Sequence, residues 1–312
     1  MATMKAVRIH EFGGPDKLVY EDAPKPEAKD GEVSIKIVAA GINPVDSMIG
    51  AGKMEAMAAH TLPLILGWDV AGTIEAVGPG VTNFQPGDPV FAFADIRVNG
   101  AYAEYIALPA TIVCPKPSSI DFPAAAAIPL AGITAWEALF EQANLQSGQT
   151  ILIHGAGGAV GGFAVQFAKA KGATVFATAT GDDVAYVQSL GADTVIDYKT
   201  EKFEDVAKNV DAVLDTVSGE TQARSWATLE DGGILVSTLP PVNPPAEATT
   251  RGITGKAFGA HPDGAHLAEI GRLVDAGQVK VRVGAVLPLP EAKQAQEQAA
   301  GGHTQGKVVL SV

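Results

Sequence analysis

Three glycines, Gly155, Gly158 and Gly161, follow the apolar run at 151–154 with the spacing G-x-x-G-x-x-G. This spacing is a variant of the fingerprint with which a strand-turn-helix unit binds a dinucleotide. Glycines allow a tight turn and a close approach of the backbone to a pyrophosphate. Ala159 and Val160 would then open a helix whose free N–H groups bind phosphate. The pattern predicts a dinucleotide site, and a purely structural turn in an α/β sheet is the alternative.

The segment after the next expected strand decides which dinucleotide is favoured. That strand ends at 176–181 without the acid that holds the ribose 2′-hydroxyl in NAD-binding folds. The hydroxyls of Thr178 and Thr180 could accept a 2′-phosphate, and Tyr198 could bind that phosphate or the adenine. Asp182 and Asp183 would repel a phosphate that they faced, but acids also suit the first turn of a helix. We therefore predict NADPH as the cofactor, with NADH less favoured.

Apolar strands and helix-compatible segments alternate over the middle of the chain. Helical spacing runs from 124 to 142, and a helix that starts at the glycines follows a strand at 150–155. Four further apolar strands are expected at 174–180, 194–198, 211–217 and 233–239. This alternation predicts an α/β fold with a doubly wound parallel sheet that is covered by helices on both faces.

The two ends of the chain have a different pattern. The first 115 or so residues contain β-rich runs between Gly, Pro, Asn and Asp turns, without long helical periodicity. Helices are expected at 266–277 and 291–300, and an apolar strand at 306–312 could complete the sheet of the first domain. We expect a mostly β domain formed by residues 1–120 and 263–312, with a nucleotide-binding domain at 121–262 inserted into it.

The composition limits the class of protein. The chain has 312 residues, of which 47% are hydrophobic and 18% charged, as is typical of packed globular domains. The net charge of −13 disfavours a nucleic-acid partner. The single cysteine, Cys114, excludes an internal disulfide and a multi-cysteine zinc site. The sequence contains no signal-like N-terminus and no apolar run of membrane length, so we expect a cytoplasmic protein without a membrane partner.

Several segments of this chain are similar to segments that recur among the members of one enzyme family. They include MKAVRIHEFGGPDKL, AAGINPVDSMIGAGK, LPLILGWDVAGTIEAVGPGV and HGAGGAVGGFAVQFAKAKGA, and with others they cover nearly the whole chain. In this combination the chain resembles the zinc-free medium-chain dehydrogenase/reductases, in particular zeta-crystallin-like quinone oxidoreductases and alkenal/enone reductases. The resemblance implies a GroES-like β domain, a Rossmann domain and an active site in the cleft between them. It also implies hydride transfer from NAD(P)H to a quinone or to the β-carbon of an α,β-unsaturated carbonyl, and a homodimer.

Zinc-dependent relatives of this family bind their catalytic zinc at positions that lack a ligand here. Their cysteine lies in the loop that corresponds to 40–46, and their histidine corresponds to Trp68. A third ligand would lie in 129–134, which contains no cysteine. Without soft ligands we expect no zinc. Oxidation of an alcohol is then disfavoured, and conjugate reduction of an activated acceptor fits better.

The same resemblance implies roles for residues near the substrate. Asn43 and Asp46 lie in a loop that faces the nicotinamide and the substrate in the family, so both are candidate catalytic residues. A turn signal and a helix cap are the alternatives. A hydrogen bond from Asn43 could stabilise a developing enolate. Lys53 lies where relatives carry a basic group near cofactor or substrate, and a solvated surface lysine is the alternative.

The pocket wall is expected to be apolar. Met48, Met54 and Met57 would form an adaptable wall, and Trp68 would form the floor, with core packing as the alternative for all of them. Many relatives carry a tyrosine just past this loop as a proton source. The stretch at 53–57 contains no tyrosine, so the source of the proton stays open.

Further residues match family segments near the cofactor. They are Thr134, Leu239, Pro240, Phe258, Gly259, Ala260, Gly306 and Lys307. Helix capping is the alternative for Thr134. His154 is expected to be a satisfied core histidine, and Tyr102, Tyr105 and Cys114 are expected to be structural.

The function predicted from the sequence is a zinc-independent, NADPH-dependent reductase of quinones or enones. Two other functions stay open. One is a non-catalytic NADPH-binding protein with a structural or regulatory role. The other is an enoyl-thioester reductase, which needs positive charge for a CoA or carrier group and is disfavoured by an acidic chain with six arginines.

Overall fold

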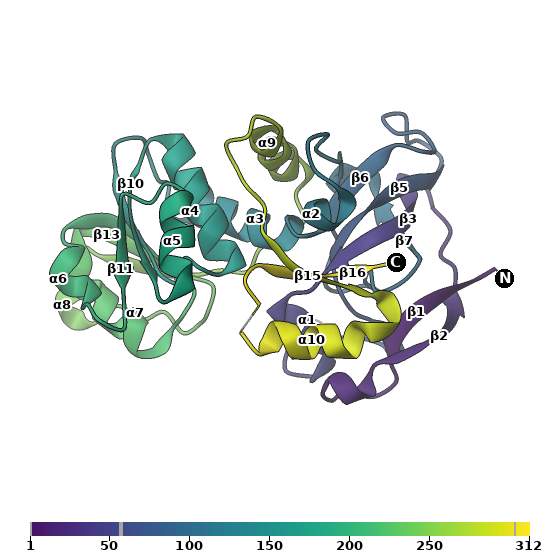
Figure 1. Ribbon diagram of the computed structural model, residues 1–312, viewed down its shortest axis with the longest axis horizontal. Helices are drawn as coiled ribbons and strands as arrows, with labels where there is room; N and C mark the ends of the chain where they lie inside the picture. Colours follow the sequence, from purple (N-terminus) through teal and green to yellow (C-terminus); the bar gives the residue numbers. More distant parts are fainter. Residues whose placement is uncertain (1, 56–58, 303) are drawn as a thin grey trace. The chain divides into compact units, whose positions relative to one another are not determined.

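The computed structural model describes residues 2–55, 59–302 and 304–312. It divides into two compact units, drawn in Figure 1. The first is formed by Met1–Leu130, His261–Gly277 and Val281–Val312, and the second by Ala131–Ala260 and Gln278–Lys280. The first unit is therefore discontinuous in sequence, and the second is inserted into it.

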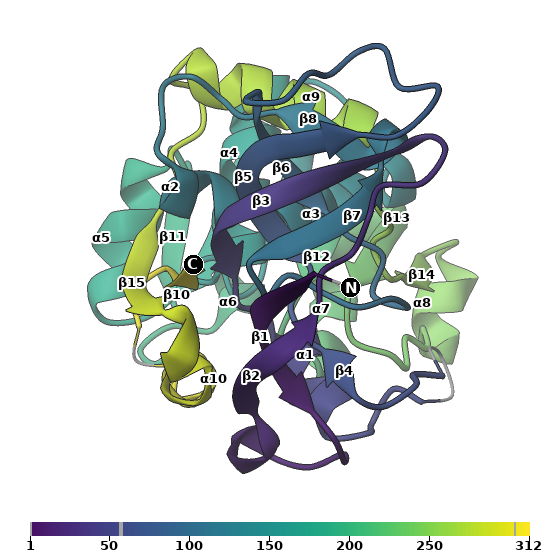
Figure 2. The same cartoon turned by 90° about the vertical axis from the view of Figure 1, so that its right-hand side faces the viewer.

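Within the described residues, the first unit is built around a seven-stranded sheet with the order β15-β16-β3-β5-β6-β8, in which β7 pairs with β3. Its strands are β3 (Glu32–Gly41), β5 (Asp69–Val77), β6 (Pro89–Phe93), β7 (Tyr105–Pro109), β8 (Val113–Pro115), β15 (Val283–Pro288) and β16 (Lys307–Ser311). The terminal strand β16 runs antiparallel to β3, with Leu310 opposite Ala40. The end of the chain thus completes the sheet of the first unit, as predicted, and Figure 2 shows β15 at one side of it.

A smaller sheet of the first unit has the order β2-β1-β4. It is formed by β1 (Thr3–Ile9), β2 (Val19–Pro24) and β4 (Leu64–Ile65). The helices are α1 (Pro44–Gly50), α2 (Phe122–Ala126), α9 (Gly264–Asp275) and α10 (Ala292–Ala300), with 3-10 turns η1 (Pro15–Lys17), η2 (Ala110–Ile112) and η5 (Leu289–Glu291). Pro44 begins α1 because its fixed φ suits a first helical position. The short connection from β3 to α1 places Asn43 and Asp46 at the end of β3.

The described part of the second unit contains a six-stranded parallel sheet with the order β11-β10-β9-β12-β13-β14. Its strands are β9 (Thr150–Ile153), β10 (Thr174–Ala179), β11 (Thr194–Asp197), β12 (Val210–Asp215), β13 (Leu229–Ser237) and β14 (Thr254–Ala257). Counted from β9, this is the order 3-2-1-4-5-6 of a dinucleotide-binding sheet. The predicted fold class is confirmed.

The helices around this sheet follow the strands in sequence. From residue 129 onward they are α3 (Pro129–Trp136), the π-helix η3 (Glu137–Gln142), α4 (Ala159–Lys171), α5 (Asp182–Ser189), α6 (Phe203–Val206), α7 (Gly219–Ser225), the 3-10 turn η4 (Trp226–Thr228) and α8 (Ala246–Thr250). Figure 1 shows α4 and α5 on one side of the sheet and α6 and α8 on the other. Because both faces are covered, Ile151, Leu152 and Ile153 of β9 are all fully buried.

Two parts of the secondary structure differ from the prediction. The helical spacing at 124–142 is divided into α2, α3 and η3. Pro129 begins α3 because proline lacks the N–H that a helix interior needs. The prediction also omits β14, whose sequence TGKA is polar and mostly exposed. An edge strand has a neighbour on one side only, so it carries no apolar run for a pattern to detect.

Candidate functional site

The glycine turn between β9 and α4 has no room for side chains at two positions. Gly155 has a φ of +70°, and a Cβ there would lie 2.4 Å from Oγ1 of Thr216. A Cβ on Gly161 would lie 2.3 Å from the carbonyl oxygen of Gly155. Both distances are shorter than van der Waals contact, so the turn requires glycine at these positions. The bare backbone that results fits the close approach of a pyrophosphate.

The helix α4 begins directly after this turn. Gly158 is its N-cap residue, and Ala159 and Val160 are its first two residues. The first N–H groups of an α-helix have no partner within the helix. Together with the positive end of the helix dipole, they suit a phosphate group. The residues present therefore fit the phosphate part of a dinucleotide cofactor.

Exposed apolar side chains follow three strands at the carboxyl edge of the same sheet. Tyr198 after β11 is 55% exposed, Val217 after β12 is 49% exposed, and Leu239 after β13 is 38% exposed. Ligands of open α/β sheets bind outside this edge. Tyr198 and Leu239 are among the predicted residues, and Val217 is not. The sequence contained a signal for Val217, because this residue ends the apolar run DAVLDTV at the same edge of the sheet.

The loop that carries Val217 is held by the buried carboxylate of Asp215. This carboxylate accepts the N–H groups of Val217 and Ser218 at 2.9 Å each. It also accepts the amide of Gln222 at 3.0 Å and the hydroxyl of Ser237 at 2.9 Å. Burial acts to raise the pKa of Asp215, but these donors bring it below its ordinary value. Asp215 therefore stays ionised and fixes the backbone beside Val217.

The two threonines predicted to bind a 2′-phosphate have partners within the second unit. Thr178 is buried, and its Oγ1 lies 3.1 Å from Nδ1 of His154. Thr180 donates from Oγ1 to Oδ1 of Asp197 at 2.9 Å. Of the three groups predicted at this end of the cofactor, Tyr198 is the one that is largely exposed.

His154 belongs to the core of the second unit. Its Nε2 lies 2.9 Å from Oγ of Ser225, and Nδ1 contacts Thr178 on the other side of the ring. Burial lowers the pKa of His154 to about 4, so the ring is neutral at neutral pH. It is a satisfied core histidine, as the sequence predicts.

The remaining predicted residues of the second unit are Thr134, Pro240, Phe258, Gly259 and Ala260. Thr134 is buried within α3. Pro240 follows β13, and residues 258–260 follow β14. These four residues thus lie at the carboxyl ends of strands, the edge of the sheet at which β9 enters the glycine turn.

A buried polar cluster lies in the first unit where α1 begins. It consists of Asn43, Asp46, Asp69, Tyr102 and Lys307, all of them buried. Lys307, in β16, donates from Nζ to the carbonyl oxygen of Ile42 at 2.6 Å and to Oδ1 of Asn43. It also contacts Oδ2 of Asp69 at 3.3 Å, and Nδ2 of Asn43 donates to the same oxygen at 2.8 Å. The three N–H bonds of the ammonium thus all have acceptors within the first unit.

Asp46 closes the other side of this cluster. Its Oδ2 accepts the backbone N–H of Asn43 at 2.8 Å, as in a capping box, and the hydroxyl of Tyr102 at 2.7 Å. Its Oδ1 has no hydrogen-bond partner in the described part of the chain. Burial raises the pKa of Asp46 to about 7, although the donors from Asn43 and Tyr102 oppose this shift. Asp46 thus contributes to the cap of α1 as a buried acid, and its catalytic role stays a prediction.

Asp69 has donors on both of its carboxylate oxygens. Oδ1 accepts the N–H of Leu130 at 2.7 Å, and Oδ2 accepts from Asn43 and Lys307. Burial raises the pKa of Asp69, and the ammonium of Lys307 counteracts this effect most strongly. One ammonium therefore faces two buried carboxyl groups. Asp69 has three donors, including the ammonium itself, whereas Asp46 has none from Lys307.

Two members of the cluster are absent from the predicted site. Asp69 begins the mostly apolar strand β5, and a charged residue at a buried position indicates a buried partner. Tyr102 is expected to be structural, and its hydroxyl donates to a predicted catalytic residue, Asp46. The signal for Asp69 was present in the sequence, whereas the partner of Tyr102 lies 56 residues away along the chain.

The residues predicted to line the substrate pocket differ in how deeply they are buried. Trp68 is fully buried, and its Nε1 donates to the carbonyl oxygen of Val98 at 2.9 Å. Lys53 is exposed and Met54 is half-buried. Met57 lies outside the described residues.

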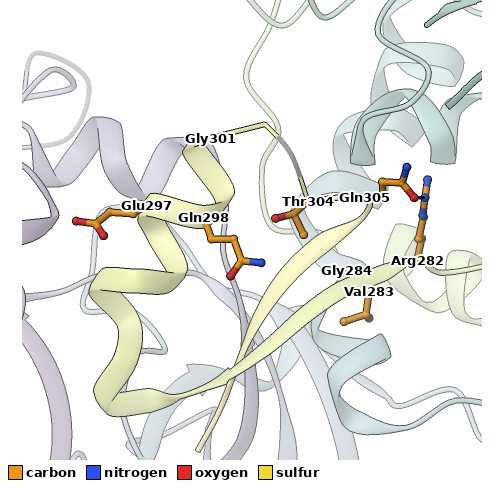
Figure 3. Close-up of a pocket in the computed structure, with 8 residues that line it drawn as sticks. All are labelled: Arg282, Val283, Gly284, Glu297, Gln298, Gly301, Thr304 and Gln305. Carbon is orange, nitrogen blue, oxygen red and sulfur yellow. Dashed lines mark hydrogen bonds between the residues drawn. The ribbon is translucent and has the colours of Figure 1, made fainter. Parts of the chain in front are cut away.

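An open polar pocket of the first unit lies between the end of α10 and the beginnings of β15 and β16, as Figure 3 shows. It is lined by Arg282, Val283, Gly284, Glu297, Gln298, Gly301, Thr304 and Gln305. None of these described residues belongs to the predicted site. Gly306 follows the pocket with a φ of +111°, and a Cβ there would lie 2.6 Å from the carbonyl oxygen of Arg282. Glycine is therefore required where the chain enters β16.

In residues 2–55, 59–302 and 304–312, no group of three or more His, Cys, Asp and Glu side chains is gathered around a common point for a metal ion. Across the same stretches of chain, every helix is too short or too polar to span a bilayer.

Two known domain families match parts of this chain. Residues 29–118 match the alcohol dehydrogenase GroES-like domain, and residues 190–310 match a domain described as zinc-binding dehydrogenase. A quinone oxidoreductase structure from Coxiella burnetii has a TM-score of 0.88 and 32% identity, with 100% of each chain covered. An alcohol dehydrogenase superfamily protein from Novosphingobium aromaticivorans has a TM-score of 0.92 and 33% identity, with 99% of each chain covered.

Curated relatives narrow the family. The chain is 35% identical over 318 residues to the chloroplastic NADPH-dependent alkenal/one oxidoreductase of Arabidopsis thaliana, covering 98% of this chain and 79% of the relative. It is 32% identical over 326 residues to the quinone oxidoreductase of Mus musculus, covering 98% and 97%. The chain therefore belongs to the zeta-crystallin-like quinone oxidoreductases of the medium-chain dehydrogenase/reductase family.

Proposed function

We propose that this chain is an oxidoreductase that uses NADPH to reduce quinones or the carbon–carbon double bond of α,β-unsaturated carbonyl compounds. The observation that carries the proposal is the glycine turn, where Gly155 and Gly161 leave no room for a side chain at the carboxyl edge of a dinucleotide-binding sheet. The relatives support the choice of acceptor, because they include a quinone oxidoreductase and an NADPH-dependent alkenal/one oxidoreductase.

The bound cofactor supplies a hydride from its nicotinamide ring. In this proposal the N–H groups at Ala159 and Val160 bind its pyrophosphate. The exposed side chains of Tyr198, Val217 and Leu239 contact its apolar ring faces. Thr134, Pro240 and residues 258–260 complete the proposed binding set.

Asn43 is the proposed hydrogen-bond donor to the substrate. An ammonium only donates and a carboxylate only accepts, so the amide of Asn43 is oriented with Oδ1 toward Lys307 and Nδ2 toward Asp69. The bond to Asp69 uses one of the two N–H groups of Nδ2. We assign the second to the carbonyl oxygen of the acceptor, where negative charge develops during reduction. Lys307 and Asp46 then act as positioning residues that hold Asn43 in place.

Other parts of the proposal rest on the sequence. Lys53, Met54 and Trp68 are assigned to the substrate side, and residues 1–120 with 263–312 to the domain that carries them. We also propose a cytoplasmic homodimer without bound zinc, since the positions that correspond to zinc ligands hold none.

The experiment is a fluorescence titration of the purified chain with NADPH, followed by 1,4-benzoquinone or a simple enone. The absorbance of NADPH reports its oxidation. Tight binding and rapid oxidation by either acceptor is the expected result. Tight binding without oxidation by any member of a panel of quinones, enones and alkenals would contradict a reductase and indicate a non-catalytic NADPH-binding protein.

A further inference from the structure

The end of the proposed cofactor site near β10 is acidic. In dinucleotide-binding sheets, the residues after the second strand lie at the adenosine ribose, where a 2′-phosphate distinguishes NADPH from NADH. Here that strand is β10, and β11 is its outer neighbour. Asp182, Asp183 and Asp197 lie at the ends of these strands or just after them, and the segment 178–198 contains neither lysine nor arginine.

Asp183 contacts the glycine turn. It lies in the first turn of α5, and a Cβ built on Gly157 would lie 2.7 Å from its Oδ2. Gly157 is within the turn that would carry the pyrophosphate, between Gly155 and Gly158. The carboxylate of Asp183 is therefore next to the proposed position of the cofactor, on the side of β10.

Asp197 accepts a hydrogen bond from the hydroxyl of Thr180, one of the two hydroxyls predicted to bind a 2′-phosphate. It is the last residue of β11 and lies opposite Ala179 in register. Its Oδ1 accepts the hydroxyl of Thr180 at 2.9 Å and the backbone N–H of Lys199 at 3.1 Å. A phosphate bound to the hydroxyl of Thr180 would have to replace Asp197 or lie beside its negative charge.

The second threonine is also engaged. Thr178 is buried, and its hydroxyl contacts Nδ1 of His154, which is itself enclosed in the core. Of the charged groups near this end, Lys199 is exposed and follows Tyr198 directly, while Glu201 accepts the N–H of Asp197 at 3.3 Å.

The sign of this electrostatic effect differs for the two cofactors. A phosphate ester carries about −1.5 to −2 charges at neutral pH. In a water-like dielectric, one neighbouring carboxylate weakens the binding of such a phosphate by roughly three- to tenfold. A ribose 2′-hydroxyl is neutral and donates a hydrogen bond, which a carboxylate accepts.

We infer that Asp183 and Asp197 are specificity-determining residues for the adenosine ribose, which disfavour a 2′-phosphate and accept a 2′-hydroxyl. The chain therefore binds NADH with an affinity close to its affinity for NADPH. This inference rests on the cofactor site of the proposed function, and it concerns the discrimination between the two cofactors rather than the reduction of the acceptor.

The experiment measures dissociation constants for NADPH and NADH by isothermal titration calorimetry at one fixed ionic strength. For the unchanged chain, the two constants should agree within about tenfold. Asp183→Asn and Asp197→Asn should each bind NADPH roughly three- to tenfold more tightly, with NADH binding unchanged or weaker. Glu247→Gln is the matched control, because it removes one exposed acid from α8 of the same unit. It should leave the ratio of the two constants unchanged.

Two results would overturn the inference. One is a preference of the unchanged chain for NADPH of more than about 100-fold. The other is a ratio of the NADPH and NADH dissociation constants that is the same in Asp183→Asn and Asp197→Asn as in Glu247→Gln. With normal NADPH-dependent reduction, either result removes this inference and leaves the proposed function intact. If neither cofactor binds the unchanged chain, both fail.

Discussion

The buried polar cluster of the first unit and the glycine turn of the second keep their shapes by different means. In the cluster, one ammonium, from Lys307, reaches Asn43 and the buried carboxylate of Asp69. In the turn, the shape depends on missing side chains, since a Cβ on Gly155 or Gly161 would lie less than 2.5 Å from a neighbouring atom. The first region is held by charge and hydrogen bonds, and the second by steric fit.

This difference predicts how each region fails. Removal of one charge leaves its partner buried and unpaired, and in a low-dielectric interior such a group is costly. Addition of one methyl group to the turn moves the backbone N–H groups that would bind phosphate. We therefore expect the cluster to respond to charge and pH, and the turn to respond to side-chain volume.

Lys307→Met is the substitution with the largest expected effect. It leaves the carboxylate of Asp69 buried without its cation, which should lower the free energy of unfolding by about 3–5 kcal/mol. Urea-induced unfolding at neutral pH measures this change. Lys293→Met is the matched control, because Lys293 is exposed on α10, and it should change stability by less than about 0.5 kcal/mol.

A second variant keeps this prediction testable if Lys307→Met does not fold. The double variant Lys307→Met/Asp69→Asn removes both charges and should regain part of the loss. Equal losses in Lys307→Met and Lys293→Met would mean that the ion pair with Asp69 contributes no more than an exposed lysine.

Gly161→Val tests the steric part of the comparison. Its Cβ would lie 2.3 Å from the carbonyl oxygen of Gly155, so the turn must shift. Loss of one hydrogen bond to the charged pyrophosphate should weaken NADPH binding by roughly 10- to 150-fold, as measured by fluorescence titration. Gly162→Ala is the control on the same helix, because its nearest neighbour would be Leu190 Cδ1 at 3.5 Å, an ordinary contact. If both variants lose affinity equally, the close contact with Gly155 is not the cause.

The two regions also differ in how well the sequence predicts them. The glycine turn is local, because three glycines within seven residues lie between an apolar strand and a helix. The cluster joins Asn43 and Lys307, which are 264 positions apart, so no local pattern reveals their contact. The family resemblance selects Asn43, Asp46 and Lys307, but it does not show that they share one network with Asp69 and Tyr102.

The fold follows the same rule. Buried parallel strands such as β9 are apolar along their length and are easily recognised, whereas the polar edge strand β14 is not. Which strands are neighbours decides whether Thr178 and Thr180 are available to a ligand. His154, the partner of Thr178, follows β9, and Asp197, the partner of Thr180, ends β11. Only the assembled sheet brings these residues together.

Asp46 predicts a pH dependence for the cluster. Burial raises its pKa from 3.8 to about 7, so the folded chain holds a proton that the unfolded chain releases between these values. The contribution of Asp46 to stability is therefore fully present at low pH and is lost as the pH rises toward 7. Compared with Asp46→Asn, the unchanged chain should be about 2 kcal/mol more stable at about pH 5 than at about pH 8. Unfolding curves at the two pH values measure this difference.

The control for this titration is Asp30→Asn, an exposed acid of the first unit. The free energy of unfolding of Asp30→Asn should depend on pH in the same way as that of the unchanged chain. A parallel pH dependence for Asp46→Asn and the unchanged chain would mean that Asp46 titrates alike in the folded and unfolded states.

Tyr102→Phe is the smallest of these changes and separates charge from packing within the cluster. The ring stays in place, but Oδ2 of Asp46 loses the hydroxyl donor at 2.7 Å. That donor favours the charged form of Asp46, so its loss should raise the pKa of Asp46 further. The variant should lose about 1 kcal/mol at about pH 8, where Asp46 is ionised, and less at about pH 5. Tyr20→Phe, on the exposed strand β2, should lose little at either pH. An equal loss for Tyr102→Phe at both pH values would mean that its hydroxyl does not stabilise a charge on Asp46, and the cluster would then resemble the glycine turn in depending on shape.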